Sequence, residues 1–319
     1  MTRPRRLLRI LLLCVVAFTE LAPAFSNAPV TIAVVTSRDI APYRAALKGF
    51  ETRLRESRTP FRIVEFDVET AGHDPEGFVD RIRAKRPGLI LTLGSAATIL
   101  MSNAVRDIPI VFSLVLPSMG RGSLEELQAR NGNITGASME IPVSTQFRKI
   151  IEVLPTAKRV GVLYDPAVTG PLIDLAGKTA LLMDLDLVAM PVSSEKDVVQ
   201  RMQEVGDQVD VLWSVADSTV FTPQGLKHIL LSTLRSRIPF VGLSPAFVKA
   251  GALVALSCNY EDVGGQSGEI AARILAGESP DRIPIAVPRE VSMSLNMNTA
   301  RQIQIAISDE VKRGAEIFF

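Results

Sequence analysis

The polar residues that stand directly after long apolar runs have the clearest chemical potential in this chain. The run 210–215 leads to Asp217, Ser218 and Thr219. Such a run predicts a buried parallel strand, whose carboxyl end is the place where open α/β sheets bind ligands. A carboxylate with two hydroxyls would there receive a cationic or hydroxyl group of a ligand. The competing interpretation is that Asp217 caps a turn before Pro223.

A second candidate is the stretch Gly94-Ser95-Ala96, which follows the apolar residues 89–93 and begins a helical pattern. At such a junction the first backbone N–H groups of the helix have no partner within it, and the helix dipole is positive. We therefore expect these three residues to hold a carboxylate or phosphate group. The alternative is that Ser95 only caps the helix.

Four further residues extend this predicted ligand site. Ser37 follows the first apolar run, Tyr43 begins the first helical pattern, Tyr164 ends a run in the second half, and Ser244 follows another. Tyr43 would stack on a ligand or donate a hydrogen bond, although a core position suits it equally. The predicted site therefore has two walls, one from each half of the chain.

Catalysis and metal binding find little support in the residues. The turn 242–246 resembles a nucleophile elbow around Ser244, but no histidine follows it, as that mechanism requires. Two histidines give no zinc-ligand spacing, and no phosphate-binding Gly-Lys-Ser/Thr motif occurs. We expect no catalytic residue, no metal and no cofactor. The glycines of 263–268 are interpreted as permitting close helix packing.

The order of the elements predicts how these residues are positioned. Apolar runs alternate with helical patterns in both halves, which predicts the α/β class with two doubly wound parallel-sheet lobes joined by hinge strands. We expect an amino-terminal lobe of residues 29–138 plus about 262–295, and a carboxyl-terminal lobe of 139–261 plus about 296–319. In this prediction 283–287 and 291–295 rejoin the first sheet, and Asp262 caps a helix.

Residues 1–24 have the pattern of a cleaved signal peptide. Arg3, Arg5, Arg6 and Arg9 form a cationic region, residues 7–18 form an apolar stretch, and Ala22-Pro-Ala24 forms a small-x-small cleavage signal. The stretch is shorter than the roughly 20 residues that span a bilayer. We expect cleavage after Ala24 and delivery to the periplasm. Leu13 precedes Cys14, which argues against lipid attachment there.

Composition agrees with an exported binding protein. Hydrophobic residues make up 47% and aromatic residues 5% of the chain, which indicates an aliphatic core. The formal net charge of +1 offers no basis for binding nucleic acid. Cleavage would leave Cys258 as the single cysteine, which we interpret as a small buried hydrophobic group.

Several phrases of the chain resemble the extracytoplasmic substrate-binding proteins of ABC transporters. They are Asn133-Ile-Thr-Gly-Ala-Ser138, Leu154-Pro-Thr-Ala-Lys-Arg-Val-Gly-Val-Leu-Tyr-Asp-Pro166 and Lys249-Ala-Gly-Ala-Leu-Val-Ala-Leu256, followed by Asn259-Tyr260 and Gly264. The resemblance covers almost all of the chain after residue 24. It implies a type I periplasmic-binding-protein fold, and some members of that family bind aromatic amino acids.

The chain departs from that family at two positions where an aspartate is common. It has Leu114-Val-Leu-Pro117 after the fourth strand and Ser244-Pro245 after a later one. Both departures remove carboxylates that would hold a ligand's ammonium group, which disfavours an amino acid.

The prediction is therefore a monomeric protein that captures a small polar or amphipathic ligand between two lobes and delivers it to an ABC permease. The alternatives are a periplasmic sensor that signals to a membrane receptor or histidine kinase, and a hydrolase using Ser244.

Overall fold

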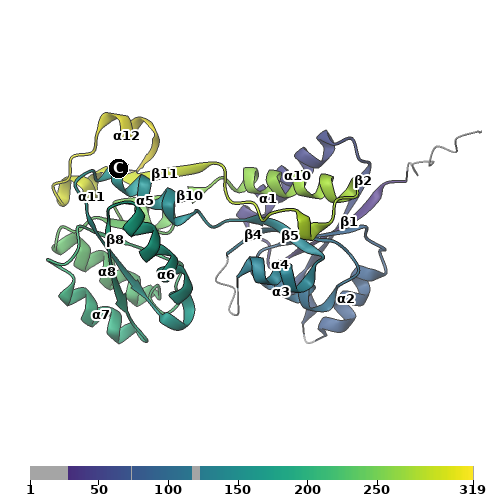
Figure 1. The fold of residues 1–319 in the computed structure, drawn as a ribbon, viewed down its shortest axis with the longest axis horizontal. Coiled ribbons are helices and arrows are strands. Elements are labelled where there is room, and N and C mark those ends of the chain that lie inside the picture. Colours follow the sequence, from purple (N-terminus) through teal and green to yellow (C-terminus); the bar gives the residue numbers. More distant parts are fainter. Residues whose placement is uncertain (1–27, 73, 117–122, 319) are drawn as a thin grey trace, which may run out of the picture.

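The computed structural model of the chain describes residues 28–72, 74–116 and 123–318. The chain forms two lobes that lie side by side, each built around a sheet with helices on both faces (Figure 1). This arrangement confirms the predicted α/β class with two doubly wound parallel-sheet lobes. The predicted signal peptide and Cys14 lie outside the described residues.

The first lobe has a parallel sheet in the order β2-β1-β3-β4-β5. Its strands are β1 (Val30–Thr36), β2 (Phe61–Asp67), β3 (Leu89–Leu93), β4 (Ile110–Val115) and β5 (Ile134–Ser138). Its helices are α1 (Ala41–Glu56), α2 (Pro75–Arg83), α3 (Ser95–Ala104), α4 (Leu124–Asn131) and α10 (Tyr260–Leu275), with short 3-10 helices η1 (Val68–Ala71) and η2 (Pro280–Arg282).

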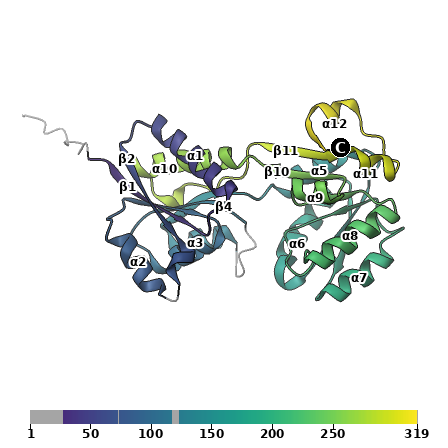
Figure 2. The ribbon, with the colours of Figure 1, turned by 180° about the vertical axis from the view of Figure 1, so that it is seen from behind.

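Both faces of this sheet are covered, which explains why its strands read as continuous apolar runs. Ile32 and Val34 of β1 pack in one cluster with residues of α1 and α10. Ala33 and Val35 point to the opposite face and pack with residues of α2 and α3. The two groups of helices lie on opposite sides of the sheet in both views (Figures 1 and 2).

The second lobe has a sheet in the order β12-β11-β10-β9-β8-β6-β7, in which the β10–β11 pair is antiparallel and the other pairs are parallel. Its strands are β6 (Arg159–Tyr164), β7 (Asp186–Pro191), β8 (Val211–Trp213), β9 (Phe240–Gly242), β10 (Val254–Cys258), β11 (Val291–Asn296) and β12 (Ala315–Phe318). Its helices are α5 (Val143–Val153), α6 (Pro166–Leu182), α7 (Glu195–Glu204), α8 (Pro223–Arg235), α9 (Pro245–Ala250), α11 (Met297–Gln302) and α12 (Asp309–Arg313).

Three connections pass between the lobes (Figure 1): β5 leads to α5, β10 leads to α10, and the chain after η2 returns to β11. As predicted, the segment around Ala286 rejoins the first sheet, where Ala286 pairs with Ala137. The placement of 291–295 in that sheet was wrong, because β11 pairs with β10. Met293 and Leu295 are the reason, since both are buried in the core of the second lobe.

Helices α1 and α10 pack at very short range through glycines, which confirms the interpretation of the glycines in 263–268. A Cβ atom on Gly264 would lie 1.9 Å from the carbonyl oxygen of Ala46, and one on Gly49 would lie 1.9 Å from the carbonyl oxygen of Glu261. Only glycine permits this backbone contact. The helix pair therefore brings α10 onto the first lobe, although the chain reaches it from the second.

The cap of α10 differs from the prediction. Asn259 is the N-cap, and its Oδ1 accepts hydrogen bonds from the backbone N–H groups of Glu261 (3.0 Å) and Asp262 (3.2 Å). Asp262 instead lies within the first turn, where its negative carboxylate interacts favourably with the positive end of the helix dipole. Its side chain pairs with Arg289.

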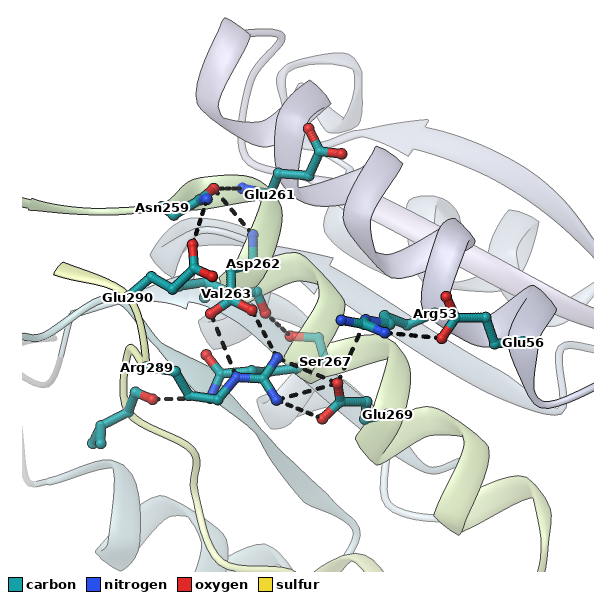
Figure 3. A network of polar contacts seen from close by, with 12 residues as sticks. Arg53, Glu56, Asn259, Glu261, Asp262, Val263, Ser267, Glu269, Arg289 and Glu290 are labelled. Atoms are coloured by element: carbon teal, nitrogen blue, oxygen red, sulfur yellow. Dashed lines mark hydrogen bonds and ion pairs between the residues drawn. The ribbon is translucent and has the colours of Figure 1, made fainter. Parts of the chain in front are cut away.

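A polar network attaches the returning connection to α10 (Figure 3). The guanidinium of Arg289 contacts Asp262 at 2.7 Å and Glu269 at 3.1 Å, and Asn259 Nδ2 donates to Glu290 at 2.9 Å. The half-exposed ion pairs contribute little stability individually, but together they hold residues 289–290 against the helix.

Within the described ranges, none of the helices is both long and apolar enough to cross a membrane.

Candidate functional site

The carboxyl ends of the strands lie on the side where the lobes meet, except for β11 and β12, which run antiparallel to the rest of the second sheet. Strand β5 ends and crosses directly to α5 of the second lobe, and β10 ends and crosses directly to α10 of the first. Because the neighbouring strands β4 and β9 run parallel to them, their polar ends share the same edges. The predicted residues therefore occupy two edges that face one another across the hinge.

Three predicted residues of the first lobe lie together. Gly94 has a positive φ of 84°, which favours glycine, and a Cβ there would lie 2.0 Å from the hydroxyl of Tyr43 and 2.9 Å from the Oγ of Ser37. The Oγ of Ser37 accepts a hydrogen bond from the backbone N–H of Ala97 at 3.0 Å. Gly94 and Tyr43 are thus in direct contact, and Ser37 caps α3 from the loop after β1.

The amino terminus of α3 retains free donors at this edge. Gly94 occupies the N-cap position, so Ser95 does not cap the helix and is its first residue. Among the described residues, no acceptor is hydrogen-bonded to the backbone N–H groups of Ser95 and Ala96. Ser95 is half-buried and Ala96 is exposed. Two N–H groups at the positive end of a helix dipole can hold a carboxylate.

A pocket of about 230 Å³ adjoins Tyr43 at the ends of β1 and β2. Tyr43 and Phe66 supply aromatic surface, while Arg38, Arg44 and Asp67 supply charge of both signs. The pocket therefore suits an amphipathic group with a flat apolar part.

Asp217 has a different environment from the one that a free ligand-binding carboxylate would have. It is only 2% exposed. Its Oδ2 accepts from the backbone N–H of Asp165 (2.8 Å) and the hydroxyl of Thr169 (2.7 Å), and its Oδ1 accepts from the backbone N–H groups of Thr219 (2.9 Å) and Val220 (3.3 Å). Asp217 therefore ties the loop after β8 to the loop after β6. Its contact with a ligand stays a prediction.

The other predicted residues of the second lobe surround this network. Thr219 Oγ1 donates to Asp165 Oδ2 at 2.8 Å, and Ser218 is exposed beside it. Tyr164 is half-buried at the margin of the core. Ser244 is at the N-cap position of α9, and its hydroxyl has no hydrogen-bond partner among the described residues. The hydroxyls of Ser218 and Ser244 are available to a ligand, and the contact of all four residues with one stays a prediction.

Two buried residues take the structural roles that the sequence indicated. Trp213 is 1% exposed, its ring packs edge-on against Phe147 at 5.1 Å, and its Nε1 donates to Gln146. Cys258 is buried and free, and burial raises the pKa of its thiol to about 11. Neither is a reactive or stacking group in the cleft.

Glu140 was missed by the sequence interpretation. It stands two residues after β5, in the first connection between the lobes, and burial raises the pKa of its carboxyl to about 7. Its position repeats the pattern of a polar residue closely following a buried strand, which is the signal that would have identified it.

A second pocket of about 330 Å³ lies in the second lobe, next to Pro191 and Arg201. Each of the two pockets draws its lining residues from one lobe alone. Among the described residues, no group of acidic, histidine or cysteine side chains is arranged to hold a metal ion.

Comparisons with known proteins identify a family. A family model described as ABC transporter substrate binding protein matches residues 29–317. A protein of Clostridioides difficile (strain R20291) named tyrosine-binding protein is 23% identical over 256 residues, which are 78% of this chain and 74% of that protein.

Solved structures agree with the two-lobed fold. The ligand-free, open structure of a substrate-binding protein with adhesive properties from Clostridium difficile has a TM-score of 0.73 and 20% identity, covering 90% of this chain and 98% of that one. The ABC domain in complex with L-Trp from Streptococcus pneumonia has a TM-score of 0.64 and 20% identity, covering 91% and 100%. At such identities the likeness shows the fold alone.

Proposed function

The chain belongs to the family of ABC transporter substrate-binding proteins, and from this premise we propose that it captures a small polar or amphipathic solute between its lobes and delivers it to an ABC permease. We further propose that it acts as a monomer in the periplasm and has no catalytic role. The alternative of a periplasmic sensor would use the same capture step with a different membrane partner.

One observation carries the capture proposal, namely the two opposed sheet edges with polar ends on either side of a hinge. The first edge offers the free N–H groups of Ser95 and Ala96 beside Tyr43. The second offers the hydroxyls of Ser218 and Ser244. Because neither edge alone surrounds a solute, binding would favour the form in which the lobes approach.

The α3 amino terminus favours a solute that carries a carboxylate, and the pocket beside Tyr43 favours one with a flat apolar part. Aromatic amino acids combine these features. One relative is named a tyrosine-binding protein, and another structure holds L-Trp. These names make L-tyrosine and L-tryptophan the first solutes to test, although the two missing aspartates argued against an amino acid.

We expect solute binding to close the lobes. The described pockets each belong to a single lobe, as in an open form, so a solute that contacts both edges should reduce the radius of gyration. Small-angle scattering with and without saturating L-tyrosine or L-tryptophan measures this change. An unchanged scattering curve, with binding verified by calorimetry, would contradict closure.

A matched pair of variants tests the α3 end within the same experiment. Ala96→Asp places a carboxylate among the free N–H groups, so it should stabilise the helix by about 0.5 kcal/mol yet weaken binding of a carboxylate solute by about tenfold or more. Gln203→Glu adds a charge to an exposed site on α7 and should leave binding unchanged. Equal solute affinities in both variants would show that the amino terminus of α3 is not part of the binding site.

We propose export to the periplasm through cleavage of residues 1–24, with Phe25 as the first residue of the mature chain. The arginines, the apolar stretch and the Ala22-Pro-Ala24 signal support this proposal. Sequencing the amino terminus of protein from a periplasmic extract should begin at Phe25. A membrane-retained chain that begins at Met1, or acylation of Cys14, would contradict it.

A further inference from the structure

Glu140 occupies a distinctive place in the connection from β5 to α5. The residues before it are fastened to the first sheet, because the backbone N–H of Ser138 donates to the carbonyl of Ala286 (2.8 Å) and that of Met139 donates to the carbonyl of Val115 (3.0 Å). The backbone N–H of Glu140 itself donates to the Oγ of Ser138 at 3.0 Å. This side chain therefore starts from a fixed point at the carboxyl edge of the first sheet.

The carboxylate of Glu140 is half-buried without compensation from the described residues. None of them donates a hydrogen bond to it or forms an ion pair with it, and the charged neighbour that acts on it is another acid, Glu125 of α4. Arg38 follows β1, which β3 and β4 separate from β5, and Arg44 of α1 pairs with Asp39. Burial first, and Glu125 second, raise the pKa of this carboxyl to about 7.

We propose that Glu140 receives the protonated amine of the captured solute when the lobes close. This inference rests on the proposed function and adds the chemical class of the solute. Glu140 is in a connection between the lobes, so closure would remove further water from it. A carboxylate that loses water requires a cation or becomes protonated. A solute amine supplies that cation, while its carboxylate is held at the amino terminus of α3.

Glu140 also supplies a carboxylate that the other candidate positions do not offer. The loops after β4 and β9 carry no aspartate, and Asp217 is engaged within its own lobe. Glu140 is an acid at the inner edge of the first lobe without a partner among the described residues. An amino acid or another primary amine is thereby compatible with this chain.

The proposal predicts proton release on binding. Near pH 7 part of the Glu140 population is protonated in the free protein, because its pKa is about 7. An amine would lower that pKa, so the proton passes to solvent as the solute binds. Affinity should rise with pH up to about 7 and then level off, by linkage.

The test compares solutes that differ only in the amine. L-tyrosine and L-tryptophan are titrated calorimetrically beside 3-(4-hydroxyphenyl)propanoate and 3-(indol-3-yl)propanoate, in buffers of different ionisation enthalpy. Wild type should bind the amines more tightly and release a proton. Glu140→Gln should weaken amine binding by about tenfold or more, abolish proton release, and leave the amine-free acids unaffected. Glu204→Gln on α7 removes a charge from an exposed site and should match wild type.

The outcomes separate this inference from the proposed function. Equal binding of amines by wild type and Glu140→Gln, or preference of wild type for the amine-free acids, would overturn the role of Glu140 and leave solute capture intact. Native mass spectrometry of protein taken from the periplasm is an independent test, because it identifies a solute that the protein retains. A retained solute with a protonatable nitrogen supports the inference, one without it overturns the inference, and no bound solute in either assay overturns capture itself.

The free protein gives a further readout that needs no solute. The pKa of Glu140 is higher in the folded than in the unfolded chain. Its favourable contribution to the free energy of unfolding is therefore complete below the unfolded pKa of about 4.5 and is lost as the pH rises through about 7. Glu140→Gln should therefore keep a steadier melting temperature than wild type between pH 5 and about 8. If the melting temperatures of wild type and Glu140→Gln changed with pH in the same way, an uncompensated carboxylate at this position would be contradicted.

Discussion

Replacing Gly264 by alanine is expected to lower the free energy of unfolding by about 3 kcal/mol. The new Cβ would lie 1.9 Å from the carbonyl oxygen of Ala46 and 2.5 Å from its Cα. Both are backbone atoms, so no side chain can rotate away and α1 and α10 have to separate. Urea or thermal unfolding, followed by circular dichroism, measures the change.

Two other glycines provide matched controls on the same substitution. Gly177 lies within α6, and a Cβ there would meet nothing within 4 Å, so Gly177→Ala should stabilise the chain by about 0.5 kcal/mol through helix propensity. A Cβ on Gly265 of α10 would lie 3.2 Å from the Cγ of Arg53, which belongs to a flexible side chain, so Gly265→Ala should give an intermediate result. Equal effects at Gly264 and Gly177 would show that the helix contact is not tight.

Replacing Asp217 by alanine is expected to lower the free energy of unfolding by about 3 to 4 kcal/mol. The side chain is 2% exposed, and its loss would leave the backbone N–H groups of Asp165, Thr219 and Val220 and the Thr169 hydroxyl without their acceptor. A buried donor without an acceptor costs about 1 to 3 kcal/mol. The melting temperature should fall even in the absence of solute.

Graded variants distinguish this structural role from a ligand contact. Asp217→Asn keeps one acceptor oxygen but turns an amide toward donors, so its cost should fall between those of wild type and alanine. Thr169→Val removes a single hydrogen bond and should cost about 1 kcal/mol. Ser218→Ala changes an exposed neighbour and should leave the melting temperature unaltered. Unchanged stability in Asp217→Ala with weakened solute binding would restore Asp217 as a ligand residue.

Only some of the physical signals that mark the candidate site are local in the sequence. The carboxyl end of a buried strand can be recognised from the sequence, because the apolar run and the polar residue after it are adjacent. Ser37, Gly94 and Asp217 were all found at such ends. What each polar group does there depends on residues far away in the chain. Ser37 accepts a hydrogen bond from Ala97 of α3, sixty residues further along the chain, and Asp217 accepts one from Asp165, at the start of another loop.

By itself the sequence determined the α/β class, the two lobes, the covered faces of both sheets and the glycine contact on α10, because each depends on periodicity or on a residue's own shape. The tertiary structure alone decided that β11 pairs with β10, that the Asp217 carboxylate is already occupied, and that no described residue compensates the buried carboxyl of Glu140. These outcomes depend on long-range pairing and on the removal of water from particular groups. Charge and polarity can be read from a chain, but burial and the partner that compensates it arise only when distant segments meet.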